Sequence, residues 1–501
     1  MLFTNMQLEQ QNYMKADFVK HILSAHRTFV SVALAAMVLC GCTSKPHDEI
    51  MVDELPPIFP DYVDVTIPSN IAPLNFLVRG FDEYDVTYSV DYQNDNNIEK
   101  WHKALTASQG KDINVTVKVR RDDGQWLQYR DFPIHVACDT IDPILTYRLI
   151  EPDYEVFSHL QIQERDMTCF DTRNLCDHKL VGNRCMNCHT FGQNRPDLSF
   201  MYVRGEGGGM ILNRNGVLRK LRVQTPEMTG GSVYAQFSPS GRYLVCSTNN
   251  IIPAFHAKPE NRLEVYDSTS DVYVVDLETN EISTSPLLCD SARMETFPCF
   301  TPDGRSIIYC KADKSLKAEE MLYSLYRIGF DPETGRLADT EECIFEAKAG
   351  EKTSVCHPRV SPDGRYLLFT IADFGTFPIW HRESDQAMMN LETMQLEPID
   401  VVNSELSDTY HSWSSNSRWF VFASKRDDGL YGRPFIAYVD ADGKAHKPFA
   451  VPQENPLFYD NFLKSFNAPE LGKAKVDFVP GDVQEIMNTK AEAFTMKLTN
   501  K

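Results

Sequence analysis

Two cysteines and a histidine at short, fixed spacing are the residues of this chain whose types and spacing could do a specific chemistry. They lie in the pentapeptide Cys185-Met186-Asn187-Cys188-His189. In c-type haem attachment, two thiols separated by two residues add to the vinyl groups of the porphyrin, and the histidine that follows ligates the iron. The spacing therefore predicts a covalent haem c held as thioethers by Cys185 and Cys188, with His189 as an axial iron ligand.

A haem of this kind has a second axial position, whose occupant decides its use. Met201 and Met210 follow His189 closely and are candidates for that position. A thioether there favours electron transfer, whereas an open position favours sensing or peroxide chemistry. Both methionines fit equally well as core residues of strands. The motif therefore predicts electron transfer or redox sensing without fixing the second ligand.

The same thiols allow a second interpretation, because Cys169, Cys176 and His178 lie just upstream of them. Cysteine and histidine side chains gathered in this way can close disulfides or complete a tetrahedral zinc site. The segment would then be a staple, and His189 a zinc ligand or a bystander. The sequence leaves both interpretations open.

The start of the chain predicts the compartment in which this chemistry would take place. Lys15, Lys20 and Arg27 precede an apolar run at residues 30–39. The run is too short for a permanent membrane-spanning helix, and a basic stretch followed by an apolar one is typical of a secretory signal. We expect residues 1–41 to be a signal peptide that is removed.

The apolar run ends in Leu39-Cys40-Gly41-Cys42, which resembles the lipobox of bacterial lipoproteins. This resemblance implies lipidation of Cys42, palmitate included, and several acyl chains would hold the protein to a membrane. A flexible tether is expected at residues 42–60. An extracytoplasmic address permits disulfides and is where bacterial c-type haem is attached.

Charge and composition limit the possible partners. The net charge of −20 disfavours nucleic acid and anionic lipid surfaces. A hydrophobic content of 42% with 11% aromatic residues is typical of globular proteins. The 501 residues are more than one small core usually organises, so we expect two or three structural units.

Short runs of alternating polar and apolar residues fill the segment 61–140, for example at 63–67, 85–90 and 114–119. This period predicts an antiparallel β-sandwich, immunoglobulin-like, with no catalytic constellation. Residues 141–199 break the pattern and contain the pentapeptide. We expect them to form an irregular, cysteine-rich connector with short helices.

From about residue 200 onward the chain repeats itself. Four similar segments start at Phe237, Phe300, Val360 and Trp413, at intervals of 53 to 63 residues. Three of them carry Ser/Thr-Pro-Asp/Ser-Gly, a turn in which proline presets φ and glycine accepts positive φ, and all four continue into an apolar strand. A second strand pair follows each hairpin, and four strands per unit make a propeller blade. The last unit has Ser-Asn-Ser at the turn, so its conformation could differ.

These segments resemble the TolB-like propeller family, whose blades carry a Ser-Pro-Asp-Gly-Arg/Lys turn, and the resemblance covers roughly residues 200–450. It implies a β-propeller with five visible units. A sixth blade could be completed by strands from residues 141–166 or from the C-terminal tail, 451–501. The predicted fold is therefore all-β: an immunoglobulin-like sandwich followed by a TolB-like β-propeller of six blades.

The order of sandwich, Cys-x-x-Cys-His connector and propeller also resembles a group of Bacteroidetes lipoproteins. That resemblance implies an outer-membrane lipoprotein on the periplasmic or cell-surface side. Similar propellers form the non-catalytic half of prolyl oligopeptidase-type peptidases, but the sequence has no Gly-x-Ser-x-Gly nucleophile motif and is too short after residue 450 for a catalytic domain. We therefore expect a binding protein rather than an enzyme, with a protein or glycan partner.

Three histidines near the blade turns, His357, His381 and His411, could line an axial channel and hold a metal or an anion. Such histidines are more often hydrogen-bonded residues of a propeller rim. The leading hypothesis is a membrane-anchored propeller that binds a partner and carries haem c. The alternative is a non-enzymatic binding scaffold in which the cysteine-rich segment is a disulfide or zinc staple.

Overall fold

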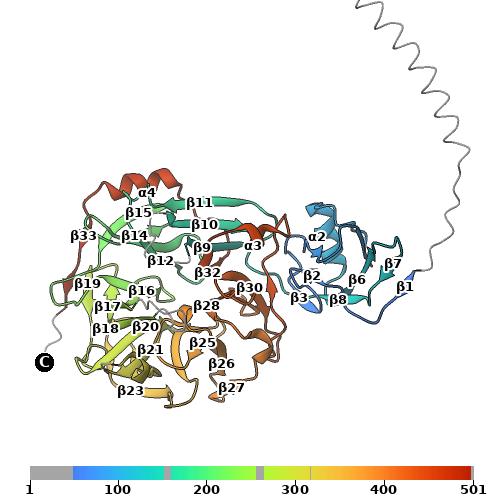
Figure 1. Cartoon of the computed structure of the whole chain (residues 1–501). Coiled ribbons are helices and arrows are strands. Elements are labelled where there is room, and N and C mark those ends of the chain that lie inside the picture. Colours follow the sequence, from blue (N-terminus) through green and yellow to red (C-terminus); the bar gives the residue numbers. More distant parts are fainter. Residues whose placement is uncertain (1–48, 152–158, 255–263, 316, 498–501) are drawn as a thin grey trace, which may run out of the picture.

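The computed structural model describes residues 49–151, 159–254, 264–315 and 317–497. They form a β-domain at the N-terminal end and a six-bladed β-propeller (Figure 1). The predicted signal peptide, Cys42 and the first part of the tether lie outside the described residues. Within the described ranges, no helix is long and apolar enough to cross a membrane.

The N-terminal domain contains two sheets and one helix. The larger sheet has the order β1 (Ile50–Met51), β7 (Trp126–Gln128), β6 (Lys111–Arg120), β8 (Phe132–Val136) and β3 (Val65–Ile67), with β5 (Tyr84–Tyr88) also paired to β6. The smaller sheet pairs β2 (Ile58–Phe59) with β4 (Leu77–Val78). The expected alternation is clear in β6, where every second residue from Ile113 to Val119 is buried.

This domain differs in detail from a purely antiparallel sandwich. The pairs β1–β7 and β3–β8 are parallel, and helix α2 (Ile98–Ala107) packs Trp101 and Leu105 into the core. Asn97 starts the helix, because its side chain accepts a hydrogen bond from the Lys100 N–H at 3.0 Å. Alternation alone does not predict a helix, so the sequence pattern missed it.

The six blades each contain four antiparallel strands, which follow one another from the axis outward. Blade 1 contains β32 (Ser465–Gly472), β9 (Ile144–Ile150), β10 (Gln161–Asp166) and β11 (Thr172–Asp177). Blade 2 contains β12 (Met186–Phe191), β13 (Leu198–Val203), β14 (Gly209–Arg214) and β15 (Val217–Arg222). Blade 3 contains β16 (Ser232–Phe237), β17 (Tyr243–Ala254), β18 (Glu264–Asp276) and β19 (Glu281–Ser283).

The other half of the propeller is regular. Blade 4 contains β20 (Arg293–Phe300), β21 (Ser306–Asp313), β22 (Ser324–Phe330) and β23 (Leu337–Phe345). Blade 5 contains β24 (Ser354–Val360), β25 (Tyr366–Ala372), β26 (Asp385–Asn390) and β27 (Gln395–Glu397). Blade 6 contains β28 (Asp408–Trp413), β29 (Trp419–Ser424), β30 (Arg433–Tyr438) and β31 (Phe449–Ala450).

The end of the chain closes and covers this ring. Two short strands, β33 (Glu492–Ala493) and β34 (Thr495–Met496), add to the outer edges of blades 2 and 3. Between β32 and β33 the chain forms helix α4 (Pro480–Met487), which packs against β15 and β11. A shorter helix, α3 (Phe458–Asn461), precedes β32.

Strands replace the irregular connector expected at residues 141–199. Residues 144–177 supply three strands of blade 1, and the C-terminal strand β32 supplies the innermost one. The sixth blade is thus built from both of the segments expected to complete it. Buried charges hide the strand pattern: Glu164 in β10 accepts hydrogen bonds from the Arg173 Nε at 2.6 Å and from the Val476 N–H at 2.9 Å.

The four predicted turns occupy equivalent places, each between the first and second strands of blades 3 to 6. The turn glycines Gly241, Gly304 and Gly364 have φ values of 73°, 69° and 76°. Ser417 takes the same place in blade 6 with φ 61°, and its N–H donates to the Ser414 carbonyl at 3.0 Å. The divergent last repeat therefore forms the same turn as the others.

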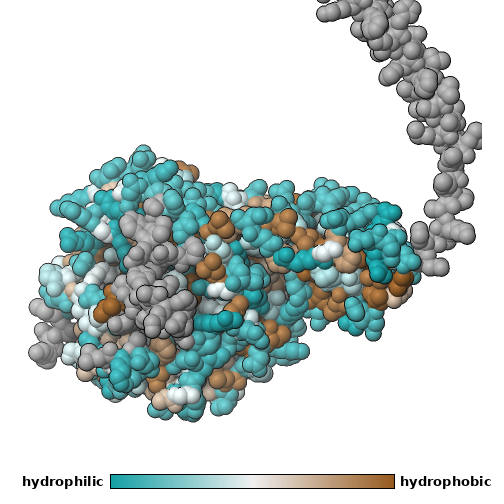
Figure 2. Space-filling model, in the orientation of Figure 1, coloured by the Kyte–Doolittle hydropathy of each residue, from teal (hydrophilic) through white to brown (hydrophobic). Residues whose placement is uncertain are grey.

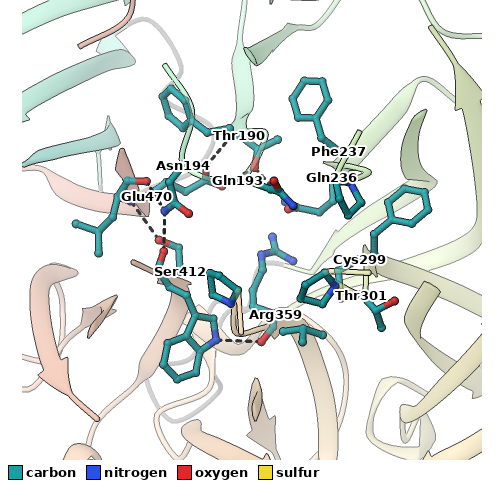
Figure 3. A pocket seen from close by; sticks show the side chains of 18 residues that line it. Thr190, Gln193, Asn194, Gln236, Phe237, Cys299, Thr301, Arg359, Ser412 and Glu470 are labelled. Carbon is teal, nitrogen blue, oxygen red and sulfur yellow. Dashed lines mark hydrogen bonds between the residues drawn. The ribbon is translucent and has the colours of Figure 1, made fainter. Parts of the chain in front are cut away.

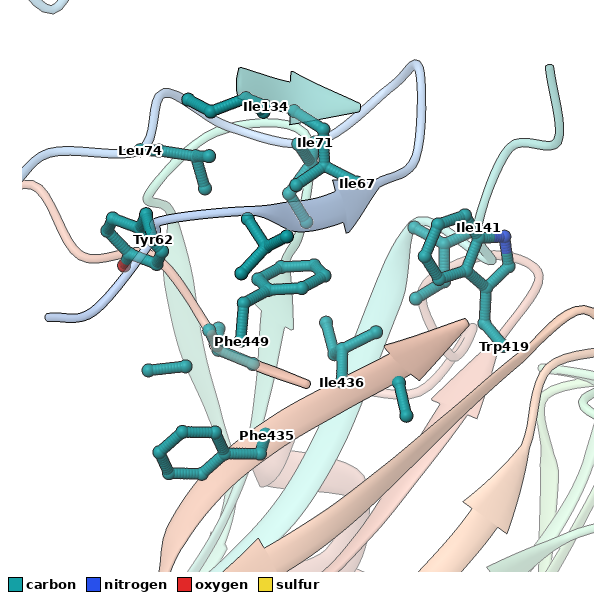
Figure 4. Packing of buried hydrophobic residues seen from close by; sticks show 14 of the residues in the cluster. Tyr62, Ile67, Ile71, Leu74, Ile134, Ile141, Trp419, Phe435, Ile436 and Phe449 are labelled. Carbon is teal, nitrogen blue, oxygen red and sulfur yellow. The ribbon is translucent and has the colours of Figure 1, made fainter. Parts of the chain in front are cut away.

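The N-terminal domain shares a continuous hydrophobic core with blade 6 (Figure 4). Tyr62 and Ile67 of the domain belong to the same buried cluster as Phe435, Ile436 and Phe449 of the propeller. The outer surface seen in Figure 2 is mostly hydrophilic, with scattered hydrophobic residues. The domain is therefore fixed on the propeller by burial of apolar side chains.

Candidate functional site: an axial cavity

Every innermost strand of the propeller contains one extra residue relative to its neighbour. The register shifts fall between Asn187 and His189, Val233 and Gln236, Thr296 and Cys299, Cys356 and Arg359, Thr409 and Ser412, and Asn467 and Glu470. Such bulges re-aim side chains and are frequent next to functional sites. Because all six blades have one, the bulge is a regular feature of this propeller.

Four aromatic residues at these bulges meet near the propeller axis. Tyr234, Phe297, His357 and Tyr410 have φ values between 47° and 52°, which bulky residues rarely adopt. Ring centroids lie 4.2 Å apart for Tyr234 and Phe297, 4.1 Å for Phe297 and His357, and 4.7 Å for His357 and Tyr410. We call these four residues the aromatic layer.

A cavity of about 130 Å³ lies on the axis at the end that carries the turns (Figure 3). Each innermost strand contributes a residue to the cavity. In five blades it directly follows the bulge toward the turn, and in blade 2 it stands one position further along: Gln236, Cys299, Arg359, Ser412, Glu470 and, in blade 2, Thr190. Gln193 and the turn prolines Pro239, Pro302 and Pro362 surround the mouth. The residues of the aromatic layer stand two positions earlier on the innermost strands of blades 3 to 6, about 7 Å along each strand.

Glu470 is one of the two charged residues that line the cavity. The Thr190 hydroxyl donates to its Oε1 at 2.7 Å, and the Phe191 N–H donates to its Oε2 at 3.0 Å. Burial raises the pKa of Glu470 to about 7, although these bonds and the Arg359 charge lower it. Near neutral pH this carboxyl group is therefore partly protonated.

Arg359 is the other charged residue, and its guanidinium points into the cavity (Figure 3). Its carbonyl accepts a hydrogen bond from the Trp413 indole at 3.1 Å, which fixes the backbone. One guanidinium nitrogen donates to the Pro358 carbonyl at 2.9 Å. In the described part of the chain, no carboxylate forms an ion pair with this guanidinium. Burial, and then the charge of Arg359, lower the pKa of His357 and His411.

The haem-type pentapeptide lies mainly on β12, the innermost strand of blade 2. Cys188 occupies the bulge register of that strand, and its side chain lies outside the described part of the structure. Cys185 precedes the strand and is half-buried, with its Sγ 3.7 Å from the Asn187 Oδ1. The motif is thus part of the propeller and not of a separate connector.

The donor chemistry of His189 suits an iron ligand. The side chain is 6% exposed, and its ring lies near the carbonyls of Thr146 and Ala468, with neither ring nitrogen in a well-aligned hydrogen bond among the described residues. Burial, and then the Arg148 charge, lower the pKa of His189 to about 4, while the carbonyls of Thr146 and Ala468 raise it. The imidazole is therefore neutral at physiological pH, as a metal ligand must be.

The space around His189 does not suit a haem. Thr146 of β9 and Ala468 of β32 lie against its ring, and the axial cavity reaches Thr190 and Phe191 but is not lined by His189. Pockets for drug-sized ligands measure roughly 300–1,000 Å³, and the axial cavity is smaller. Haem attachment would require β12 to separate from β9 and β32, so the packing of these three strands does not fit the group.

The two candidate second ligands are buried in hydrophobic clusters. Met201 is the direct ladder partner of His189 between β12 and β13. Met210 lies in β14 and packs in the cluster formed by blades 2 and 3. A porphyrin between His189 and Met201 would break the β12–β13 ladder, so their pairing does not favour this ligand set.

Of the residues of the proposed staple, Cys176 belongs to the hydrophobic cluster against which Cys185 packs, whereas Cys169 and His178 have other neighbours. The Cys176 Sγ lies 3.0 Å from the Met186 Sδ, and the His178 ring contacts the His159 ring at 6.1 Å. Cys169 is half-buried near Asp171. The described residues contain no group of three or more histidine, cysteine or acidic side chains that could hold a metal. A disulfide to Cys188 is not tested, because its side chain is not described.

Two of the three rim histidines lie beside the axis. His357 belongs to the aromatic layer, and the His411 Nε2 contacts the Leu368 carbonyl at 3.0 Å. His381 lies elsewhere, directly after the short helix Pro378–Trp380, with its Nδ1 3.2 Å from the Glu383 carboxylate. The three do not converge on one site, and the sequence pattern did not single out Arg359 or Glu470.

Comparisons with known proteins show similarity at the level of architecture. The sequence matches no protein-family model and no curated protein. A putative TolB from Agrobacterium tumefaciens is 14% identical, with a TM-score of 0.36, over 68% of this chain and 95% of that one. A GH74 enzyme from Niastella koreensis is 8% identical, with a TM-score of 0.36, over 60% of this chain and 53% of the enzyme.

Prolyl oligopeptidase B from Galerina marginata is 9% identical, with a TM-score of 0.34, over 62% of this chain and 44% of that one. The chain therefore spans about half the length of these two enzymes. At these identities and TM-scores, the neighbours carry no information about function. The six closed blades themselves establish the propeller.

Proposed function

We propose that the protein is a binding scaffold whose propeller takes a partner, a protein or a glycan, at the mouth of the axial cavity. The observation that carries this proposal is the convergence of one side chain from each of six blades on a single cavity that contains the Arg359 guanidinium. Concave sites with a few convergent polar groups are typical binding sites. The rim is formed by loops on a rigid scaffold, which is where binding residues concentrate.

The mouth of the cavity is held in place before any partner arrives. The Asn194 side-chain amide donates to the carbonyls of Trp413 and Leu471, both at 2.8 Å, and so ties the blade 2 loop to blades 6 and 1. Gln193 beside it is exposed at the mouth. A fixed rim lowers the entropy cost of binding.

Affinity capture from an envelope extract tests this proposal. Wild-type protein, Arg359→Gln and the control Asp122→Asn, an exposed site on the N-terminal domain, are immobilised in equal amounts. We expect a partner that the wild type and Asp122→Asn retain and that Arg359→Gln loses by at least tenfold. Equal recovery by all three proteins would place binding elsewhere and refute the axial site.

Membrane attachment is a second part of the proposal. The Leu39-Cys40-Gly41-Cys42 sequence supports lipidation of Cys42 and an outer-membrane location on the periplasmic or cell-surface side. A lipid anchor would present the propeller at a surface without any membrane-spanning segment. A Cys42→Ala variant should leave the membrane fraction or stay unprocessed, and unchanged partition would refute the anchor.

Haem attachment at Cys185, Cys188 and His189 stays a separate proposal, for electron transfer or redox sensing. Its support is the motif spacing and the neutral imidazole of His189. The close packing around that ring counts against it. The binding function does not depend on haem, because Arg359 and the cavity exist without it.

A further inference from the structure

We propose that the axial cavity binds a carboxylate group and that Arg359 is the residue that recognises it. This inference rests on the proposed binding function and names the chemistry of the ligand. A carboxylate could come from a small organic acid or from the end or side chain of a protein partner.

Arg359 has hydrogen-bonding capacity that the described residues do not use. A guanidinium has five N–H donors, and the contact with the Pro358 carbonyl uses one of its nitrogens. Among the described residues, no acidic side chain pairs with it. Arg359 is half-buried, and arginine and carboxylate form two parallel hydrogen bonds. A carboxylate ligand supplies both the charge and the acceptors that Arg359 lacks.

Glu470 does not serve as that partner, although it lines the same cavity. Both of its carboxylate oxygens already accept hydrogen bonds, from Thr190 and from the Phe191 N–H. These bonds hold it on the β12 side of the cavity. Arg359 therefore remains the cation that an incoming anion meets.

Size and charge restrict the ligand further. The cavity of about 130 Å³ is smaller than the roughly 300–1,000 Å³ of pockets that hold drug-sized ligands. That space accepts a carboxylate on a short carbon chain, or the end of a longer ligand, and not a drug-sized molecule. One arginine beside an acidic residue suits a singly charged anion better than a phosphate dianion, because the second charge would face Glu470 without a cation.

A neutral donor completes the site. The Ser412 hydroxyl lines the cavity and accepts a hydrogen bond from the Leu471 N–H at 3.3 Å, which leaves its own proton free to donate into the cavity. A carboxylate held by Arg359 could therefore accept a further hydrogen bond from Ser412.

Calorimetric titration of the purified protein tests the inference. The probes are propionate, its neutral analogue propionamide, inorganic phosphate, and one tripeptide with a free or an amidated C-terminus. We expect propionate and the free tripeptide to bind, and both neutral analogues to bind at least tenfold more weakly. If the free tripeptide binds more tightly than propionate, the carboxylate ligand is the end of a protein chain. If propionate binds more tightly, the ligand is a small organic acid.

Variants assign the binding to Arg359. Arg359→Gln should lose at least tenfold in propionate affinity. Arg359→Lys should lose less, because lysine keeps the positive charge but cannot form the two parallel hydrogen bonds of a guanidinium. Asp122→Asn is the control and should bind as the wild type does. Thermal unfolding checks that each variant folds. If Arg359→Gln does not fold, the propionate affinity of Arg359→Lys is compared with that of the wild type instead.

Three results would overturn the inference. The first is that the folded wild type binds no carboxylate. The second is that the Arg359 variants bind propionate as tightly as the wild type does, and the third is that the wild type binds phosphate more tightly than propionate. If one of these occurs while capture of the partner still requires Arg359, the scaffold function stands and only the ligand class is wrong. If capture is also insensitive to Arg359, the axial site itself is refuted.

Discussion

Arg359 is the residue that sets the electrostatics of the propeller axis. Burial, and then the charge of Arg359, lower the pKa of both His357 and His411, so these rings stay neutral beside it. Glu470 offsets the charge only in part, because burial raises its pKa to about 7. The chain carries a net charge of −20, yet an arginine lines this cavity. The contrast favours an anionic group as the part of a partner that enters the cavity.

The residue scale also offers a direct test of haem. Thioether attachment predicts a Soret band in protein purified from its native host, retained after denaturation because the bonds are covalent. The double variant Cys185→Ala/Cys188→Ala should abolish the band, and His189→Ala should shift it. Cys246→Ala removes a buried thiol outside the motif and serves as the control. An absorption spectrum without a Soret band would remove the haem proposal.

Glu295 provides a pH test of the buried charges. Its carboxyl group is fully buried, 3.6 Å from the Lys311 Nζ, and burial raises its pKa to about 8 although Lys311 lowers it. Between its ordinary value of 4.5 and about 8, the folded state therefore binds more protons than the unfolded state. The free energy of unfolding should fall as the pH rises through that window.

We expect Glu295→Gln to reduce this fall by roughly 3 kcal/mol, measured by urea unfolding at pH 5 and pH 8.5. Glu342→Gln, at an exposed carboxyl group of the same blade, is the control and should leave the slope unchanged. An identical pH dependence in wild type and Glu295→Gln would mean that Glu295 is not protonated in the folded state.

At the scale of the element, the innermost strand and its turn form the repeated unit of function. In blades 3 to 6, the residue that lines the cavity stands two positions before the Ser or Thr of the turn: Gln236, Cys299, Arg359 and Ser412. The bulge in each strand re-aims the side chains next to it. The turn motif therefore marks the axial residues as well as the fold.

The turn itself makes a prediction about stability. Gly304 has φ 69°, and a Cβ added there would meet the Pro239 Cδ at 3.3 Å. We expect Gly304→Ala to lower the free energy of unfolding by about 1 to 2 kcal/mol, because an L side chain disfavours this conformation. Gly481→Ala in α4 is the matched control, since it has open space and no positive φ. Equal effects of the two changes in denaturant unfolding would show that the turn does not need glycine.

These elements also show how far the sequence could predict the structure. The propeller and the placement of four turns on one end followed from the repeated Ser/Thr-Pro motif. Arg359 could have been found by reading two positions back from Ser361. Thr190 and Glu470 could not, because their blades lack the turn motif. The strands within residues 141–199 escape the pattern for a different reason, since buried charges such as Glu164 hide the alternation of the blade 1 strands.

At the scale of the whole molecule, the N-terminal domain and the propeller share one core. Phe449 is fully buried in the cluster that joins them. We expect Phe449→Ala to lower the free energy of unfolding by about 3 to 5 kcal/mol. The N-terminal domain and the propeller should lose stability together, as measured by calorimetry and far-UV circular dichroism. Leu430→Ala, at a half-exposed site on the propeller, should change stability by less than about 0.5 kcal/mol. Two separate transitions, with only one shifted by Phe449→Ala, would show that the domains unfold independently.

Binding of a partner at the mouth of the axial cavity can be tested directly by photo-cross-linking. A photo-cross-linking residue is placed at Gln193, on the rim of the cavity, and in a second protein at Asp122, on the surface of the N-terminal domain. Each protein is illuminated in an envelope extract with and without an excess of the tripeptide that has a free C-terminal carboxylate. The account predicts a cross-linked partner at position 193 that the free peptide displaces, and none at position 122. A partner cross-linked at position 122 and absent at position 193 would contradict the claim that this propeller binds through its axial cavity.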